Sequence, residues 1–534
     1  MTKILLVSAT LDFEFSGWLH KHVPSLTVQK AYTVPLHLAT VAALTPDEYE
    51  VMIWDEAVQG QISEGTEFGT DFDLVGVTAY SNHLSRAKKI ARIFRARGVT
   101  VVIGGAGVTA EPETVRDDFD VLFLGEAELT WPQFLVDFKN GCYDRVYQPT
   151  SFPDLGTSPR PRWDSIAHLL SSGYKTGGVQ VNRGCPYDCE FCHVWIKFGR
   201  KIRTKPIDQV MDEVAAFERL GMKRVIFCTD NFVGDPRYAK AVLRELILLN
   251  NSFEHPLRFI TELTMNISRD EEMLQLLADA NFAGLFIGIE SPSVDSLKET
   301  RKRQNLHREN SMVDQCLKVQ SYGMPIQGSM IVGFDHDTPD IFDQQFEFLQ
   351  EACIAIPRLN ILKAGKGTEL YNRMFAEGRV MDVERSYAGM SVSFPDDSFS
   401  SNIIPKSMTR VEMYAGYLSL LERVWDWKNF EARMIGFIDN IKRMPERKPD
   451  DRLTQAYNSV RASIHQFPRV DRDVVENIFA YTERHAAPLL WDVGALVMLQ
   501  CWESSRLPVL REALENQVRV EESLEESHSL VTAS

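Results

Sequence analysis

The stretch VQVNRGCPYDCEFCHVW, residues 179–195, constrains this chain more than any other, because it holds three cysteines with the spacing C-x3-C-x2-C. Soft thiolate ligands such as Cys185, Cys189 and Cys192 select zinc, copper(I) or iron–sulfur clusters. We therefore expect this stretch to form a loop that presents three sulfurs to one metal group. No fourth cysteine lies nearby, and a scattered free cysteine usually behaves as a small buried hydrophobe. The five scattered cysteines are Cys142, Cys228, Cys316, Cys353 and Cys501.

Three interpretations of the loop remain open. Three cysteines on a four-iron cluster leave one iron free, so that a small molecule can chelate that iron and receive an electron. A zinc site would need a fourth ligand such as His193, which directly follows Cys192 and is awkwardly placed to close a compact chelate with it. The three cysteines could also be structural. The spacing favours the cluster.

Length and composition describe an ordinary soluble protein. The 534 residues suffice for two to four domains, and 44% hydrophobic and 25% charged residues provide ample core material. No run of about eighteen apolar residues occurs, and the N-terminal MTKILLVSAT favours a first strand over a signal peptide. Eight cysteines, three of them clustered, fit a reducing compartment. We expect a cytoplasmic protein without a transmembrane segment.

The net charge of −16 argues against nucleic acid as a partner, because binding long phosphate backbones requires a basic surface. A local basic patch remains conceivable between Lys197 and Lys205. Residues 516–534 are acidic and polar, and they predict a frayed, flexible tail.

Residues 1–140 alternate short apolar runs, such as KILLVSA and VTVVIGGAG, with helical patterns such as SRAKKIARIFRARG. This alternation predicts an α/β domain with a doubly wound parallel sheet, whose ligands lie at the carboxyl ends of the strands. Several residues at these strand ends are candidates for close approach to a large ligand, although turn residues would look the same. They are Thr78, Ala79, Tyr80, Ser81, Gly104, Gly105, Gly125 and Glu126.

Residues 141–178 are rich in Pro and Ser and predict a linker. Residues 179–380 again alternate, with six apolar runs separated by helical patterns, and residues 381–515 show helical spacing alone. In that last region Trp425, Trp427, Phe430 and Phe437 either wall a hydrophobic pocket or, as their spacing favours, pack in a core.

The six runs between residues 179 and 380 also end in polar or small residues. Carboxyl ends of barrel strands are where enzymes place their chemistry, so these residues are candidate ligands. Along the chain they are Asp230, Asn231, Glu262, Glu290, Gly328, Gly333 and Ala364, the last of which begins the loop AGKGT.

These motifs together resemble the radical S-adenosylmethionine (SAM) superfamily, whose cluster loop has the same cysteine spacing with an aromatic, here Phe191, before the last cysteine. The first domain resembles the cobalamin-binding domain that precedes the SAM barrel in one large class. The end of the chain, from SNIIPKSM onward, resembles the helical region of the subgroup that includes the hopanoid C-2 methylases. Motifs shared with the cobalamin domain are Pro35 to Ala39, Asp55-Glu56, Gly104-Gly105 and Gly125 to Trp131.

The resemblance implies three cofactors and their residues. Cys185, Cys189 and Cys192 would hold a catalytic [4Fe–4S] cluster on a partial (β/α)6 barrel. SAM would contact Phe191 and the seven strand-end residues from Asp230 to Ala364, and cobalamin would contact the eight strand-end residues of the first domain. The D-x-H-x-x-G motif that supplies an axial histidine to cobalt is absent, since the first loop reads LDFEFSGW, and His83 is the only histidine expected beside these loops.

The implied activity is cobalamin-dependent methylation of an unactivated carbon in a small molecule or lipid, with an electron donor such as flavodoxin or ferredoxin. Lys366 and Glu369 replace two prolines of related enzymes, so they either contact a polar substrate or are simply solvated. A non-methylating outcome, by rearrangement, cyclisation or 3-amino-3-carboxypropyl transfer, stays open, and so does a non-catalytic zinc-binding interaction protein.

Overall fold

The computed structural model describes residues 1–10, 31–306, 310–381, 400–445 and 451–532. The chain forms two compact units. Unit 1 comprises Met1–Gly184 and Lys197–Thr229, and unit 2 comprises Cys185–Ile196 and Asp230–Ser534. The cysteine loop therefore belongs to unit 2, although the segments on both sides of it belong to unit 1. The first loop, residues 11–18, lies outside the described residues.

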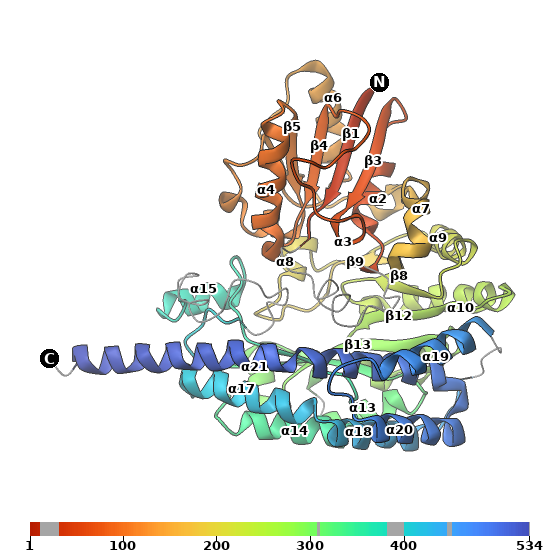
Figure 1. Ribbon diagram of the computed structural model, residues 1–534, viewed down its shortest axis with the longest axis vertical. Coiled ribbons are helices and arrows are strands. Elements are labelled where there is room, and N and C mark those ends of the chain that lie inside the picture. Colours follow the sequence, from red (N-terminus) through yellow and green to blue (C-terminus); the bar gives the residue numbers. More distant parts are fainter. Residues whose placement is uncertain (11–30, 307–309, 382–399, 446–450, 533–534) are drawn as a thin grey trace. The chain divides into compact units, whose positions relative to one another are not determined.

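A six-stranded parallel sheet forms the N-terminal part of unit 1, with the strand order β3-β1-β4-β5-β6-β7 (Figure 1). The chain runs from β1 to the edge strand β3 and then returns to β4 on the other side of β1, which is the reversal of a doubly wound fold. The expected doubly wound sheet is confirmed. Its strands are β1 (Thr2–Ser8), β3 (Tyr49–Asp55), β4 (Leu74–Thr78), β5 (Thr100–Gly104), β6 (Val121–Phe123) and β7 (Val146–Tyr147).

Helices cover both faces of this sheet because alternate strand residues point to opposite sides. On one face, Leu5 and Val77 belong to a buried cluster with Ile90 and Phe94 of helix α4 (Leu84–Arg95). On the other face, Leu6 and the indole of Trp131 in helix α6 (Thr130–Asn140) fill the space that a side chain at Gly76 would take. Unit 1 also contains α2 (Leu36–Ala43), α3 (Glu56–Gln59) and α5 (Ala106–Ala110).

A second parallel sheet in unit 1 contains β2 (Ala31–Thr33), β8 (Tyr174–Gln180) and β11 (Arg224–Cys228). Helix α9 (Ile207–Arg219) packs on it so closely that a Cβ at Gly177 would lie 2.7 Å from the ring of Phe217. The antiparallel pair β9 (Asn182–Arg183) and β10 (Arg203–Thr204) flanks the cysteine loop in sequence.

Unit 2 continues the alternation with four parallel strands. Together with β8 and β11, they confirm the six strands expected between residues 179 and 380, although β8 begins at Tyr174, inside the segment expected to be a linker. The strands are β12 (Arg258–Leu263), β13 (Phe282–Glu290), β14 (Ile326–Val332) and β15 (Arg358–Ile361). The helices between and after them are α10 (Pro236–Ser252), α11 (Glu271–Asp279), α12 (Val294–Glu299), α13 (Met312–Gln320), α14 (Ile341–Glu351) and α15 (Glu369–Ala376).

The C-terminal part of unit 2 is helical, as expected, and α17 packs against α14 and α21 (Figure 1). The aromatic residues considered as a pocket wall, Trp425, Trp427, Phe430 and Phe437, are all buried in the core. The helices are α17 (Arg410–Val424), α18 (Trp427–Asn440), α19 (Asp451–Ile464), α20 (Arg472–His485) and α21 (Leu490–Thr532).

The predicted frayed tail is wrong in one respect, because α21 continues as a helix from residue 516 through Thr532. A buried ion pair joins this part of α21 to α17, since Arg410 donates to Glu521 at 2.7 Å. The acidic residues after 516 are therefore not all solvated.

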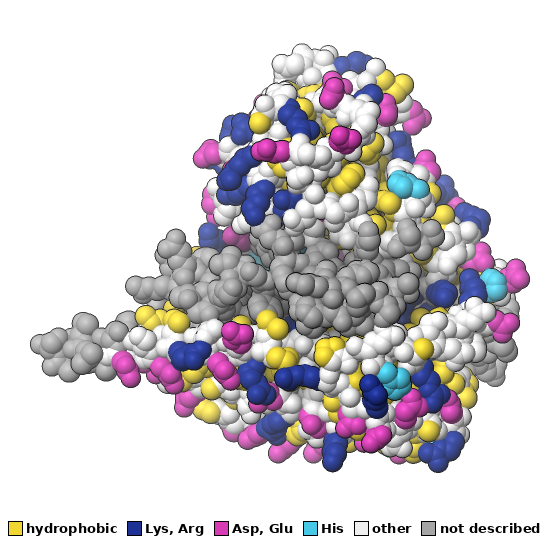
Figure 2. Space-filling model, in the orientation of Figure 1, with side chains coloured by type: hydrophobic (Ala, Val, Ile, Leu, Met, Phe, Trp, Pro, Cys, Tyr) yellow, Lys and Arg dark blue, Asp and Glu magenta, His cyan; other side chains and the backbone are white. Residues whose placement is uncertain are grey.

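Across the described residues, no helix is both long and apolar enough to span a membrane. On the face drawn in Figure 2, basic and acidic side chains are interspersed along the described part of the surface. The described part of this face therefore carries no large patch of one charge sign.

Candidate active site

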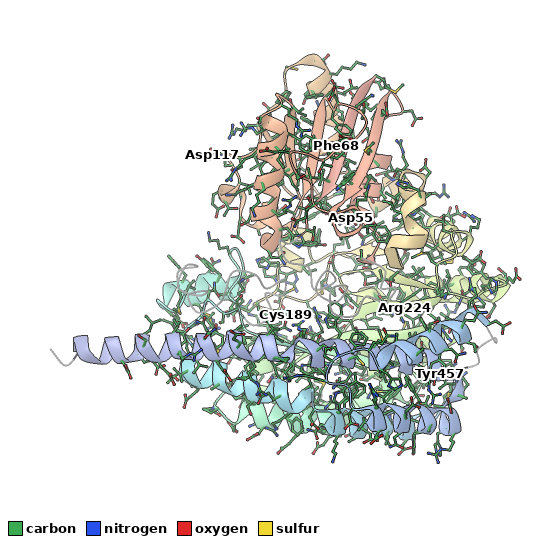
Figure 3. The ribbon with its side chains drawn as sticks, in the orientation of Figure 1. Asp55, Phe68, Asp117, Cys189, Arg224 and Tyr457 are labelled. Atoms are coloured by element: carbon green, nitrogen blue, oxygen red, sulfur yellow. The ribbon has the colours of Figure 1, made fainter. Side chains whose placement is uncertain are left out.

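The cysteine loop is held at Glu190, directly after Cys189, by contacts with other segments of unit 2, and at Cys189 by a contact within the stretch itself (Cys189 is labelled in Figure 3). The N–H of Glu190 donates to the carbonyl of Thr300 at 3.0 Å, and the Glu190 carboxylate receives two bonds from the Arg373 guanidinium, at 2.7 and 3.1 Å. The indole of Trp195 donates to the carbonyl of Cys189 at 3.1 Å. The loop backbone is thus held independently of any metal group.

An N–H donor approaches each of the three thiols, and Cys185 also receives a hydrogen bond from the main chain of Tyr187. The side-chain amide of Asn231 lies 4.0 Å from the sulfur of Cys185, and the amide of Gln304 lies 3.4 Å from the sulfur of Cys189. The third donor is the main-chain N–H of Val194, 3.4 Å from the sulfur of Cys192. Donors of this kind stabilise negative charge on sulfur, which thiolate ligands of a cluster carry.

Burial raises the pKa of the Cys185 thiol, and it raises the pKa of the Cys192 thiol to about 12. Without a metal these thiols would stay protonated at neutral pH, whereas a bound metal deprotonates its thiol ligands. One buried and two half-buried thiols, each with an N–H donor, fit a cluster bound through three cysteines.

The geometry does not support the zinc interpretation. Within the described ranges, no group of three or more His, Cys, Asp or Glu side chains is arranged to hold a single metal ion. His193, the expected fourth zinc ligand, instead contacts the carbonyl of Lys366 through Nε2 at 2.9 Å, and its ring lies against Gly365. A cluster makes no such demand, because its three thiolates bind three different irons.

Two predicted SAM residues, Asp230 and Glu262, follow β11 and end β12. The pKa of Glu262 is raised to about 7. The main cause is desolvation by the surrounding protein atoms, and the smaller cause is the negative charge of Asp230, although part of the Glu262 side chain is exposed to solvent. Asn231, predicted with them, is buried and directed at Cys185. This corner of unit 2 therefore combines carboxylates with a thiol.

Glu290, also predicted to contact SAM, is held by a partner within the protein. A register shift between Gly288 and Glu290 interrupts β13, and Glu290 has a left-handed backbone with φ of 69°. Its carboxylate accepts a bond of 2.6 Å from the buried ammonium of Lys302. Burial lowers the pKa of Lys302. The negative charge of Glu290, and to a smaller extent that of Cys189, raises it by more, so the pKa of Lys302 lies above its ordinary value.

The remaining predicted residues of unit 2 have mixed surroundings. Gly328 faces apolar packing, since a Cβ there would lie 2.9 Å from Ile289, and Gly333 adopts a φ of 102° that favours glycine. Ala364 is buried, and Asn402 bonds both its N–H and its carbonyl, at 2.9 and 2.8 Å.

Among the aromatic and charged candidates of unit 2, the side chains of Phe191 and Glu369 contact other side chains, whereas Lys366 contributes a main-chain carbonyl. The ring of Phe191 packs against Phe334 with centroids 6.1 Å apart. The carboxylate of Glu369 pairs with Arg301, and Lys366 uses its carbonyl to contact His193.

In unit 1, the predicted cobalamin residues lie at the carboxyl ends of β4, β5 and β6, which are neighbours in the sheet. The loops after β4 and β5 pack directly on each other. A Cβ at Gly105 would lie 2.7 Å from the carbonyl oxygen of Ala79, and a Cβ at Gly107 would overlap the backbone of Tyr80 and Ser81. These glycines are thus required by contact between two loops, while Tyr80 itself remains exposed.

Glu126, predicted to contact cobalamin, instead anchors the start of the cysteine loop. Its buried carboxylate pairs with Arg183 and accepts bonds of 2.6 and 3.0 Å from Arg203, while Arg183 also pairs with Glu128 at 2.7 Å. Gly125 adopts a φ of 80° and donates to the hydroxyl of Thr109 at 2.9 Å.

The expectation that His83 is the only histidine near these loops is incomplete. His83 ends the turn before α4 and is half-buried, and His37 of α2 is close enough to interact electrostatically with it. The protein atoms around His37, and to a smaller extent the charge of His83, lower the pKa of His37 although the residue is exposed to solvent, and burial lowers the pKa of His83. Both imidazoles are therefore neutral at pH 7. The position of His37 within the motif PLHLA offered a signal, but its electrostatic interaction with His83 depends on the fold.

Three family models match the chain: the radical SAM superfamily over residues 179–349, a B12 binding domain over 26–135, and a domain of unknown function (DUF4070) over 368–471. An uncharacterized methyltransferase of Synechocystis is 31% identical over 68% of this chain and 67% of its own length. The hopanoid C-2 methylase of Rhodopseudomonas palustris is 27% identical over 74% of each chain.

Among solved structures, the fold is similar to that of TsrM, a radical SAM methyltransferase from Kitasatospora setae with bound cobalamin and [4Fe-4S] cluster. The TM-score is 0.62 at 15% sequence identity, and the match covers 91% of this chain and all of the other. At that identity the likeness concerns the fold.

Proposed function

Because the chain belongs to the radical SAM superfamily, in the group that carries an N-terminal B12-binding domain, we propose that it is a methyltransferase acting on an unactivated carbon. Its cofactors are a [4Fe–4S] cluster, SAM and cobalamin. The observation that carries the proposal is the presence, on one chain, of a three-cysteine cluster loop and a B12-binding sheet. An enzyme that only cleaved SAM would need the loop alone.

The residues of this chain bind, orient and shield. Cys185, Cys189 and Cys192 hold the cluster, and Asn231 orients Cys185. Asp230 and Glu262 contact the ammonium or the ribose hydroxyls of SAM, where carboxylates provide both charge and acceptors. When bound, the cluster and SAM supply one-electron cleavage of the sulfonium, and cobalamin supplies the methyl group.

The surroundings of the other predicted residues refine this assignment. Phe191, Gly333 and Ala364 remain candidates for the adenine side, since Phe191 lies within the cysteine loop while Gly333 and Ala364 follow β14 and β15. Glu290 and Gly328 are less suitable, because Lys302 neutralises the first and apolar side chains fill the space beside the second. Thr78, Tyr80 and Ser81 remain the candidates for cobalamin, whereas Glu126 serves the protein itself.

The methyl acceptor is a small molecule or a lipid. Support comes from the relative named hopanoid C-2 methylase, and the substrate of this chain is otherwise open. The electron that cleaves SAM comes from a carrier such as flavodoxin or ferredoxin in the cytoplasm. Lys366 and Glu369 are weak candidates for a polar substrate, since Arg301 already occupies the Glu369 carboxylate.

The test is anaerobic product analysis. The protein is reconstituted with iron, sulfide and hydroxocobalamin, reduced, and incubated with SAM and an extract of candidate acceptors. Formation of 5′-deoxyadenosine together with S-adenosylhomocysteine supports methylation. Methylthioadenosine would instead indicate 3-amino-3-carboxypropyl transfer, and 5′-deoxyadenosine alone, with no cobalamin retained, would indicate a rearrangement or cyclisation.

A further inference from the structure

A polar segment with several buried side chains contacts the cysteine loop. It is Thr300–Asn305, with the sequence TRKRQN, and it follows helix α12. Lys302 and Gln304 are each 6% exposed and Asn305 is 2% exposed, although all three side chains are strongly polar. Burying such groups is costly unless they are bonded, so their partners indicate what the segment is for.

Two of the partners fix the segment in place. The amide of Asn305 donates to the carbonyls of Gly288 and Ile289, both at 2.9 Å, at the end of β13. Lys302 pairs with Glu290, and Gly288 leaves room for that pair, since a Cβ there would lie 2.7 Å from the Lys302 ammonium. A left-handed backbone at Arg301, with φ of 58°, turns the chain between them.

The segment also reaches the cysteine loop directly. The carbonyl of Thr300 accepts the N–H of Glu190, and the amide of Gln304 donates to the sulfur of Cys189 at 3.4 Å. Cys189 is the only one of the three loop cysteines whose residue is buried. Only the amide nitrogen suits this contact, because an amide oxygen beside a thiolate would be repelled. The Gln304 oxygen has no partner among the described residues, so the sulfur contact is the one bond that this buried side chain makes.

From this geometry we propose that Gln304 is a positioning residue of the cluster, which fixes Cys189 and makes the cluster easier to reduce by donating a hydrogen bond to its sulfur. The physical reason is that reduction adds negative charge to the cluster, so an N–H donor stabilises the reduced state more than the oxidised state. Lys302 supports the same state with its positive charge, offset in part by Glu290. The inference requires the cluster and is independent of which product SAM yields.

The experiment compares Gln304→Leu and Gln304→Glu with the wild-type chain after anaerobic reconstitution, without SAM or substrate. The matched control is Gln320→Leu, because Gln320 is equally a buried glutamine of unit 2 but donates to the carbonyl of Ala352 at 2.7 Å. The readouts are iron and sulfide content, the charge-transfer spectrum and a reductive titration of the cluster potential.

We expect both Gln304 variants to have a more negative potential than the control. Loss of one charge-assisted bond should change the reduction equilibrium about ten-fold, which is about 59 mV for a one-electron couple, and Gln304→Glu should exceed Gln304→Leu. A potential equal to that of the control, at full iron content, would overturn the proposal.

A Gln304 variant that fails to retain iron is compared with the wild-type chain by its unfolding temperature without metal, which distinguishes positioning of Cys189 from a packing role of Gln304. If it unfolds at the same temperature as the wild-type chain without metal, the residue positions Cys189 and the proposal stands. If it is unfolded or strongly destabilised without metal while Gln320→Leu is not, Gln304 has only a packing role and the proposal fails.

Discussion

The cluster side of unit 2 and the strand-end loops of unit 1 both carry the motifs that predicted their ligands, but they use their polar groups differently. In unit 2, donors from three different segments converge on the sulfurs of the cysteine loop. In unit 1, the acidic motif residues bond to the protein itself, as Glu126 does to two arginines and Glu56 does to Arg86. A cluster needs specific groups aimed at its ligands, whereas a large cofactor bound by loops first needs those loops to be held in place.

The largest expected effect concerns Cys189. Cys189→Ala should abolish the iron–sulfur charge-transfer colour and the formation of 5′-deoxyadenosine, because the cluster loses one of three ligands. Cys142→Ala, at an exposed cysteine, is the control and should retain both. Retention of SAM cleavage in Cys189→Ala would show that Cys189 is not a ligand of the cluster, and the contrast drawn between unit 2 and unit 1 would then fail.

Glu126 tests whether the acidic residues of unit 1 serve the fold. Glu126→Ala leaves Arg203 without its carboxylate partner and Arg183 with Glu128 alone, and breaking a buried pair costs roughly 3–5 kcal/mol. The free energy of unfolding from chemical denaturation should fall by that order. Glu48→Ala, which breaks the exposed pair with Lys139, should cost less than about 1 kcal/mol. Normal stability combined with lost cobalamin binding would assign Glu126 to the cofactor instead.

The buried carboxyl of Asp337, in unit 2, should make the free energy of unfolding depend on pH. Burial raises its pKa to about 6, despite bonds from Ser296, Phe334 and Gly333. Because the folded state holds the proton more tightly than the unfolded chain, this group makes the protein less stable as the pH rises from about 4 to 6. The shift corresponds to about 3 kcal/mol.

Asp337→Asn should remove that contribution. Unfolding free energies measured at several pH values should therefore fall with pH more steeply in the wild-type chain than in the variant. Parallel profiles would mean that Asp337 is ionised throughout and that its hydrogen bonds outweigh its burial.

The smallest effect is at Gly107. Gly107→Ala should destabilise unit 1 by about 2 kcal/mol, because the new Cβ would overlap the backbone after β4 and force the two loops apart. Gly65→Ala, where a Cβ meets open space, should change the unfolding temperature hardly at all. Equal unfolding temperatures of the two variants would show that the loops can separate freely, and so that they are not prearranged.

The sequence was sufficient for the alternation of the main strands and helices, because alternation and cysteine spacing are local properties, but it did not predict the short strands β2 and β7. It placed Asp230 and Glu262 at strand ends, and Cys185, Cys189 and Cys192 on one loop. It could not show that Gln304 donates to Cys189, because these residues lie far apart along the chain. It also could not show that Lys302 pairs with Glu290, because this pair depends on the left-handed backbone of Glu290 and Arg301.

For helix α21, by contrast, the sequence led to a wrong prediction. Its acidic composition predicted a solvated tail, yet one buried contact between Arg410 and Glu521 places part of it in the core. Charge composition alone does not distinguish a solvated glutamate from a paired one.

Native mass spectrometry of the anaerobically purified, reconstituted chain tests the central claim most directly. The account predicts a folded chain whose mass exceeds that of the polypeptide by one [4Fe–4S] cluster and one cobalamin. A chain that carries a single zinc ion and neither cofactor would contradict it.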